Sequence, residues 1–479
     1  MQMNQENMTM LTDFYELTMG NGYFHGAMTE QVAYFDVFYR QVPDHGGFAI
    51  AAGLEQVVHY IENLHFSEED IAMLREQKIF SEEFLQYLRN FRFTGDLYAV
   101  PEGTVIFPGE PILTVRAPLI QAQLLETYIL LSLNHQSLIA TKSNRIVRAA
   151  DGRPVAEFGA RRAHGSEAAV MGARASYIAG CASTSNVLAA QKYGVPASGT
   201  MAHSWVQMFD DEYTAFKTYC ELYPQQSTLL IDTYNVLKSG LPNAIRAFKE
   251  VLWPQGIRSC GVRIDSGDIT YLTKKVRRIL DEEGLTECKI VISNSLDEYL
   301  IQDVLRQGAC IDAFGVGERL ITSESAPVFG GVYKLAALER DGEIIPKLKI
   351  SENITKITNP HFKKVYRFYD KVSGKAEADV LFIHDEAVSA EEPLEIFDPD
   401  FPWKKKTLTN FTMRALLQPI FIQGKCVYDL PDVETIRTYC AQEVDTLWEE
   451  VKRFANPHQY YVDLSLKLWN LKNQLLGKK

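Results

Sequence analysis

The chain has 479 residues, of which 46% are hydrophobic and 23% charged, a composition typical of a globular protein with two or three domains. Its formal net charge of −12 (49 Lys and Arg against 61 Asp and Glu) argues against a nucleic-acid-binding surface, because such surfaces concentrate basic residues. The 7 cysteines are widely spaced and form no Cys-x-x-Cys pair, which disfavours a structural zinc site or a disulfide framework.

The sequence has no pattern typical of secretion or of membrane insertion. Residues 1–6 lack the basic and then apolar order of a signal peptide. The most apolar helical stretch, residues 124–138, is interrupted by Glu126, Asn134 and His135, which disfavours a membrane-spanning helix. We therefore expect a cytoplasmic protein that has neither a membrane nor a nucleic acid as a partner.

Residues 1–150 have the pattern of an N-terminal α/β domain. Leu11, Phe14, Tyr15 and Thr18 recur at helical spacing, and residues 32–39 alternate enough to predict a strand. Further elements are predicted as a helix over 53–63 and as short strands over 97–100, 104–107 and 111–115. This part of the sequence carries no signature of a metal site or of a nucleophile.

Residues 151–340 differ, because short apolar runs alternate there with helical stretches. The apolar runs cover residues 155–158, 229–231, 261–264, 290–292 and 313–316. This succession predicts parallel strands joined by helices, and we favour an α/β barrel over an open sheet. No Gly-x-Gly-x-x-Gly segment opens a helix, so a dinucleotide-binding sheet is disfavoured. Residues 341–479 are expected to form a C-terminal extension that packs on the other two domains.

The most informative motif follows the strand predicted over 261–264. Asp265, Ser266, Gly267 and Asp268 come directly after this strand, and a helical pattern begins immediately behind them. In parallel α/β folds such a turn lies at the carboxyl end of the sheet, where ligands bind. Gly267 lets backbone N–H groups approach a ligand, and the two carboxylates can hold ribose hydroxyls or a metal-bound diphosphate. The alternative is that Ser266 or Asp268 only caps the helix.

The other predicted strands also end in polar segments, and in a barrel these segments converge on one face. They contain Gly159, Arg161, Arg162, His164, Gly165, Thr200, His203, Ser204, Asp232, Thr233, Ser293, Asn294, Ser295, Gly315, Gly317, Glu318 and Thr322. Arginines and glycine-turn N–H groups hold phosphate oxygens, whereas carboxylates hold ribose hydroxyls or Mg²⁺. The set therefore suits a sugar phosphate that carries a diphosphate, and we expect His203 to have a chemical role.

Simpler interpretations of these residues stay open at this point. Ser293 and Asn294 can act as a helix cap, and Gly315 and Gly317 can form an ordinary tight turn. A phosphate-binding aldolase or isomerase is a second class, although no lysine directly follows a core strand to form a Schiff base. A metabolite-binding protein without catalysis is a third.

Six motifs, in order along the chain, resemble those of the nicotinate phosphoribosyltransferase family. They are Leu11-Thr-Asp-Phe-Tyr-Glu-Leu-Thr-Met19, Glu157-Phe-Gly-Ala-Arg-Arg162, Ser183-Thr-Ser-Asn186, Gly199-Thr-Met-Ala-His-Ser204, Gly261-Val-Arg-Ile-Asp-Ser-Gly-Asp268 and Gly330-Gly-Val-Tyr-Lys334. The resemblance implies a type II phosphoribosyltransferase fold with an irregular α/β barrel, working as a homodimer. It also implies synthesis of nicotinate mononucleotide from nicotinate and 5-phosphoribosyl 1-diphosphate, coupled to ATP and using Mg²⁺. That reaction is the first step of NAD salvage from nicotinate.

The resemblance further implies roles for individual residues. His203 would be phosphorylated by ATP, with Arg263 and Asp265 beside it in the catalytic group. Nicotinate would contact Phe158, Thr200 and Arg263, and would stack on Tyr15 of the partner subunit. The phosphoribosyl diphosphate would be held by Arg161, Ser266, Gly267, Asp268, Ser293, Asn294, Gly315, Gly317 and Thr322. The ligands of the metal are not assigned by the sequence.

Two positions, compared with related enzymes, bear on substrate binding. Relatives often have Thr in the last glycine turn, where this chain has Glu318, so only backbone N–H groups are expected to hold phosphate there. Ser185 stands where the related nicotinamide enzymes carry an acid that accepts the amide N–H. Since an acid would repel a carboxylate, Ser185 together with Arg263 favours nicotinate. A nicotinamide phosphoribosyltransferase of the same fold is the alternative.

Overall fold

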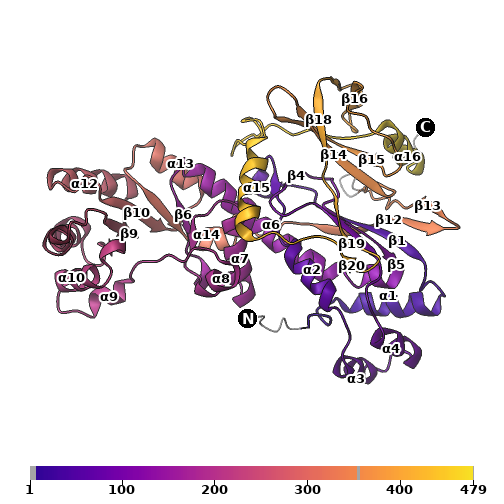
Figure 1. Ribbon diagram of the computed structural model, residues 1–479, viewed down its shortest axis with the longest axis horizontal. Coiled ribbons are helices and arrows are strands. Elements are labelled where there is room, and N and C mark those ends of the chain that lie inside the picture. The colour runs from indigo at the N-terminus through magenta and orange to yellow at the C-terminus, as the bar shows by residue number, and fades with distance from the viewer. Residues whose placement is uncertain (1–6, 353–356, 478–479) are drawn as a thin grey trace. The chain divides into compact units, whose positions relative to one another are not determined.

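The computed structural model describes residues 7–352 and 357–477, which form two compact units (Figure 1). One unit combines residues 1–138 with 328–479, and the other contains residues 139–327. The sequence predicted three domains with divisions near residues 150 and 340. The two compact units divide at 138/139 and 327/328, and the N- and C-terminal parts of the chain share one unit.

Six parallel strands form the sheet of the 139–327 unit. They are β6 (Val155–Glu157), β7 (Ser183–Thr184), β8 (Thr228–Leu230), β9 (Gly261–Ile264), β10 (Lys289–Asn294) and β11 (Ala313–Val316), in the order β7-β6-β11-β10-β9-β8. Every neighbouring pair runs in the same direction. The predicted parallel α/β arrangement is therefore confirmed, and the residues that follow the strands meet at one edge of the sheet.

The backbone hydrogen bonds do not close this sheet into a ring. Within residues 139–327 the strands β7 and β8 are its two edges. The segment that follows α8 extends the β7 edge, because Thr184 N–H donates to the Pro196 carbonyl (3.0 Å) and Ser198 N–H donates to the Thr184 carbonyl (2.9 Å). The strand pairing therefore shows a parallel sheet, and the irregular barrel stays a prediction from the sequence.

Helices connect the strands of this unit. They are the carboxyl-terminal part of α6 (Glu126–Ala149), α7 (Ser166–Ile178), α8 (Val187–Tyr193), α9 (His203–Gln207), α10 (Glu212–Leu222), α11 (Leu241–Ala247), α12 (Ile269–Glu282), α13 (Glu298–Arg306) and α14 (Glu318–Ile321). In α12 the residues Ile269, Val276 and Leu280 are buried at helical spacing, while the polar face is solvated. Asp268 begins this helix by accepting a hydrogen bond from the Tyr271 N–H (2.7 Å).

The other unit contains a seven-stranded antiparallel sheet. Its strands are β1 (Val32–Phe38), β3 (Asp96–Ala99), β5 (Leu113–Pro118), β12 (Val332–Arg340), β13 (Glu343–Pro346), β19 (Gln418–Ile422) and β20 (Lys425–Cys426), in the order β13-β12-β1-β5-β3-β19-β20. The interior strand β1 pairs with β5 on one side and with β12 on the other. Segments from both ends of the chain therefore build a single sheet.

The C-terminal region adds a four-stranded sheet, β18-β14-β15-β21, and a two-stranded one, β16-β17. These strands are β14 (Lys363–Asp370), β15 (Ala376–Ile383), β16 (Leu394–Phe397), β17 (Lys405–Leu408), β18 (Phe411–Ala415) and β21 (Val462–Leu464), and β2 (Ala49–Ile50) pairs with β4 (Val105–Ile106) elsewhere in the unit. Phe368, Phe382 and Phe411 lie in the hydrophobic cluster of this region. The buried Arg367 pairs with Asp379 at 2.6 Å, which compensates its charge.

The helices of this unit are α1 (Phe14–His25), α2 (Leu54–Asn63), α3 (Glu68–Glu76), α4 (Glu82–Arg89), α5 (Leu119–Gln123), the first half of α6, α15 (Val433–Asp445) and α16 (Leu466–Leu475). Ser67 caps α3 in a reciprocal arrangement with Asp70, and Ser81 caps α4. Over the described residues, no helix combines the length and apolar character needed to cross a membrane.

Candidate functional site

Arg263 forms the centre of a hydrogen-bonded cluster in the 139–327 unit. It lies on β9, and its guanidinium donates to the Thr200 hydroxyl (2.6 Å) and to the Met201 carbonyl (3.1 Å). It also donates to the Ser293 hydroxyl at the end of β10 (2.7 Å) and to Asp265 (3.1 Å). The half-buried guanidinium therefore brings together loops that follow three different strands. These bonds use four of the five N–H donors of the guanidinium, so a carboxylate or phosphate would meet its positive charge and the remaining donor.

Two acidic residues lie beside this arginine. Asp265 accepts a hydrogen bond from the Ser293 hydroxyl, and its own N–H donates to Asp232 Oδ2 (3.1 Å). The same Asp232 oxygen accepts from the Ser266 hydroxyl (2.5 Å), whereas Asp232 Oδ1 is buried and has no hydrogen-bond partner among the described residues. Asp232 lies two residues after the end of β8 and was noted in the sequence only as a strand-end residue. Its unpaired oxygen identifies it as a further candidate for ligand binding.

His203 begins α9, and its Nδ1 lies 3.1 Å from the hydroxyl of Thr233. Thr233 follows the edge strand β8, while His203 follows the segment that extends the opposite edge strand β7. This contact therefore brings the loops after the two edges of the open sheet together. The ring is half-buried, and bonding at Nδ1 leaves Nε2 as the atom for chemistry with a ligand.

Phe158 lies against Gly315, because a Cβ added to Gly315 would come within 2.6 Å of two atoms of the phenyl ring. Only glycine at this position leaves room for the ring. The preceding residue, Glu157, is buried at the end of β6 and accepts hydrogen bonds from the Thr184 hydroxyl (2.6 Å) and the Gly159 N–H. Burial raises the pKa of Glu157, although both of these bonds act in the opposite direction. Sequence reasoning did not single out Glu157 as a residue that anchors this loop.

The remaining predicted residues are placed as follows. Asp268 caps α12, as one of the two interpretations of the sequence predicted. Gly267 has φ +87°, a value that favours glycine. Asn294 accepts from the Ser295 N–H (2.7 Å), and the Thr322 hydroxyl donates to the Glu318 carbonyl (2.7 Å). Arg161 is exposed in the turn after β6, and Gly317 precedes α14.

Tyr15 belongs to the other unit and is the second residue of α1. Tyr15 is 44% exposed. Phe14 and Met19 of the same helix, and Leu11 in the turn before it, are exposed to similar extents. Partial burial, and then the nearby charge of Glu126, raises the pKa of Tyr15. The exposed apolar stripe on α1 is a feature that a partner could cover.

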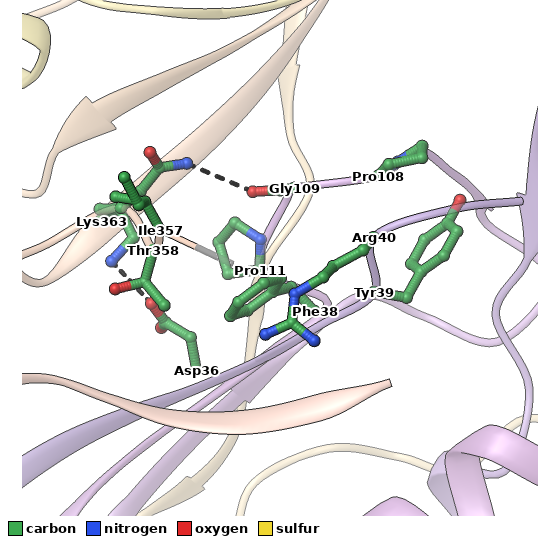
Figure 2. A pocket seen from close by; sticks show the side chains of 11 residues that line it. Asp36, Phe38, Tyr39, Arg40, Pro108, Gly109, Pro111, Ile357, Thr358 and Lys363 are labelled. Carbon is green, nitrogen blue, oxygen red and sulfur yellow. Dashed lines mark hydrogen bonds and ion pairs between the residues drawn. The ribbon is translucent and has the colours of Figure 1, made fainter. Parts of the chain in front are cut away.

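A separate pocket of about 210 Å³ lies in the unit of residues 1–138 and 328–479 (Figure 2). Asp36, Thr358 and Lys363 group on one side of it, and Arg40 lies next to Phe38. Lys363 pairs with Asp36 at 2.6 Å, and the Asn359 amide donates to the Gly109 carbonyl (3.4 Å). None of the site residues predicted from the sequence lines this pocket, so we base the candidate site on the cluster around Arg263.

Among the described residues, no group of three or more His, Cys, Asp or Glu side chains is arranged to hold a metal ion by itself. A divalent cation in the Arg263 cluster would therefore need ligands from a substrate as well as from the protein. This is the usual situation for Mg²⁺ bound with phosphates.

Comparison with known proteins gives matches over nearly the whole chain. Models of the nicotinate phosphoribosyltransferase N-terminal domain, family and C-terminal domain match residues 10–134, 154–373 and 362–472. The chain is 43% identical to the nicotinate phosphoribosyltransferase of Bacillus subtilis (98% of this chain, 95% of the relative). It is 40% identical to that named pncB2 in Mycobacterium tuberculosis (94% and 90%). The crystal structure of the human nicotinic acid phosphoribosyltransferase matches with a TM-score of 0.83 at 29% identity (97% and 100%).

Proposed function

Since this chain belongs to the nicotinate phosphoribosyltransferase family, we propose that the cluster around Arg263 joins nicotinate to the ribose of 5-phosphoribosyl 1-diphosphate. The products are nicotinate mononucleotide and diphosphate, and the reaction is the first step of NAD salvage from nicotinate. The observation that carries this proposal is the guanidinium of Arg263, held by Thr200 and Ser293 among loops at the carboxyl end of a parallel sheet. The alternative substrate nicotinamide is not favoured by the relatives.

Arg263 would bind the carboxylate of nicotinate, while Phe158 supplies a flat apolar surface for the pyridine ring. This positions the ring nitrogen, which carries a lone pair and no proton at neutral pH. The nitrogen attacks C1 of the ribose as the bond from C1 to the diphosphate oxygen breaks. No general base is needed, since no proton leaves the nucleophile. Thr200, which holds Arg263 at 2.6 Å, orients the guanidinium for this contact.

The phosphoribosyl diphosphate would lie over the loops that follow β9, β10 and β11. Asp265 would accept from ribose hydroxyls, and the backbone near Ser266, Gly267 and Asp268 would approach the phosphate oxygens. Arg161, Ser293, Asn294, Gly315, Gly317 and Thr322 are proposed to complete this part of the site. Asp232, with one buried oxygen unpaired, fits a hydroxyl or a metal-bound water as a partner.

Mg²⁺ is proposed as the cofactor, and the acidic residues fit it. Asp232 and Asp265 would hold the ion directly or through water, and the substrate phosphates would supply the other ligands. When bound, Mg²⁺ neutralises charge on the departing diphosphate. The protein residues described above would orient the sugar and the pyridine ring for the transfer.

ATP is proposed as a co-substrate that phosphorylates His203. In the tautomer in which Nδ1–H donates to Thr233, the Nε2 lone pair attacks the γ-phosphorus and the bond to ADP breaks. The phosphoryl group adds negative charge beside the acidic cluster, which would strengthen the binding of Mg²⁺ and organise the diphosphate. We also propose a homodimer in which the exposed stripe on α1 contacts the partner and Tyr15 reaches the other subunit's site.

Two further predictions accompany this proposal. The sheet of the 139–327 unit is proposed to act as an irregular barrel, supported by the contact between His203 and Thr233. The cytoplasmic location remains a prediction from the sequence.

The test is a steady-state assay of the purified chain with 5-phosphoribosyl 1-diphosphate, Mg²⁺ and either nicotinate or nicotinamide, with and without ATP. We expect nicotinate mononucleotide to form, with stimulation by ATP. A strong preference for nicotinamide without any effect of ATP would overturn the proposed substrate.

A further inference from the structure

Glu318 connects three loops at one corner of the candidate site. Its Oε1 accepts a hydrogen bond from the Ser295 hydroxyl (2.5 Å), and its Oε2 lies 3.8 Å from Arg162 Nε. Arg162 follows β6, Ser295 follows β10 and Glu318 follows β11 and Gly317. The Glu318 carboxylate therefore accepts a hydrogen bond from the hydroxyl of one neighbouring loop and faces the guanidinium of another.

A hydroxyl and a guanidinium are the side-chain donors that bind a phosphate group. The other donors of this corner are already used within the protein. Arg319 pairs with Asp297 (2.6 Å) and Glu324 (3.1 Å), and the Thr322 hydroxyl donates to the Glu318 carbonyl. Ser295 and Arg162, in contrast, are directed at the Glu318 carboxylate. This carboxylate faces them as an anionic ligand would.

We propose that Glu318 sets the affinity for phosphoribosyl diphosphate, because its carboxylate competes with a phosphate group of the substrate for Ser295 and Arg162. This inference rests on the proposed function. The phosphate can engage the Ser295 hydroxyl only when Glu318 gives it up, and the fixed negative charge beside Arg162 also repels the phosphate dianion at short range. Glu318 contacts no reacting atom, so it acts on binding of this substrate and not on the chemical step.

The removal of the charge is tested by Glu318→Gln, which preserves the shape and an acceptor for Ser295. We expect the Kd of 5-phosphoribosyl 1-diphosphate with Mg²⁺, measured by calorimetry, and its KM to fall about fivefold or more, with kcat within about twofold. Because salt screens half-exposed charges, the ratio of the wild-type Kd to the variant Kd should shrink as ionic strength rises. A purely structural role would not produce this salt dependence.

Two further variants separate charge from packing. Glu318→Asp retains the negative charge with a shorter side chain, and its KM should stay within about twofold of the wild type. Glu324→Gln removes an exposed acid that pairs with Arg319, and it should leave both constants unchanged. The inference is overturned if Glu318→Gln has the wild-type Kd, or if Glu318→Asp lowers Kd as much as Glu318→Gln does.

The binding measurement also separates this inference from the proposed function. If the wild type binds 5-phosphoribosyl 1-diphosphate but does not transfer it to nicotinate, the proposed function fails, and the Kd of Glu318→Gln still decides the role of Glu318. If the wild type forms product and Glu318→Gln matches it in Kd and KM, only the inference fails. Absence of binding by the wild type would overturn both.

Discussion

Thr200 and Arg263 are 63 positions apart in the sequence, and the Thr200 hydroxyl accepts a hydrogen bond of 2.6 Å from the Arg263 guanidinium. The same guanidinium reaches Ser293, so its orientation is fixed by loops from both sides. An arginine held in this way presents its remaining surface to a ligand at low entropic cost, which is why we place the carboxylate of nicotinate there.

Replacement of Arg263 tests that position. Arg263→Lys keeps the charge but loses the fork of donors, so we expect kcat/KM for nicotinate to fall about 10- to 100-fold. The loss should be much smaller for nicotinamide, which has no carboxylate. Steady-state kinetics with both pyridines measures the difference. An equal loss for the two substrates would show that Arg263 acts on something other than the carboxylate.

Gly315→Ala tests the contact with the Phe158 ring. The new Cβ would lie 2.6 Å from two ring atoms, so the ring must move, and we expect a destabilisation of about 1–3 kcal/mol together with a higher KM for nicotinate. Thermal unfolding and steady-state assays measure the two effects. Adding Phe158→Leu should recover stability without recovering the KM, since the flat surface stays absent. Recovery of both would argue against a role of the ring in binding.

His203→Ala should abolish labelling by ATP that carries a labelled γ-phosphate. The wild type is expected to incorporate an acid-labile phosphoryl group, because a phosphorus–nitrogen bond hydrolyses in acid. His164→Ala provides the matched control, since His164 also follows a strand of the same sheet and should leave the labelling intact. Equal incorporation by wild type and His203→Ala would exclude phosphorylation of His203.

The proposed trans contribution of Tyr15 can be tested by complementation. Tyr15→Ala and His203→Ala are each expected to be nearly inactive, because each removes a different part of the shared site. Mixed after reversible dissociation, they should regain about a quarter of wild-type activity, since half of the dimers then contain one intact site out of two. Mass spectrometry shows whether mixed dimers have formed. If they have and the activity does not exceed that of the separate variants, both residues belong to the same subunit's site.

Asp463 predicts a pH dependence of stability. Burial, and then the charge of Asp398, raises the pKa of Asp463 from 3.8 to about 7. The folded state therefore holds this proton more tightly than the unfolded state, and its contribution is present below about pH 4 and lost as pH rises to about 7. After allowance for solvent screening, the change amounts to about 2 kcal/mol. Denaturant unfolding at several pH values should show this dependence of the unfolding free energy in the wild type and a flatter one in Asp463→Asn. Asp429→Asn, which changes an exposed carboxylate, is the control and should behave like the wild type.

The sequence by itself determined the elements whose signals are local. The helix predicted over 53–63 is α2 (Leu54–Asn63), and the strands expected over 261–264 and 313–316 are β9 and β11. Apolar spacing and capping residues act over a few positions, so they can be recognised without knowledge of the fold. By contrast, the apolar spacing over residues 436–454 predicts a longer helix than α15, which ends at Asp445, because the buried Leu447 and Val451 that extend this pattern pack outside the helix.

Only the tertiary structure decided which polar residues meet. Asp265 and Asp268 belong to one motif, yet Asp265 contacts Ser293 whereas Asp268 is used to cap α12. Asp232, Glu157 and Glu318 acquire their roles from partners on other loops. Likewise, β1 pairs with β12 across about 300 residues of chain. Such pairings depend on the path of the backbone through space, which residue types and their spacing do not encode locally.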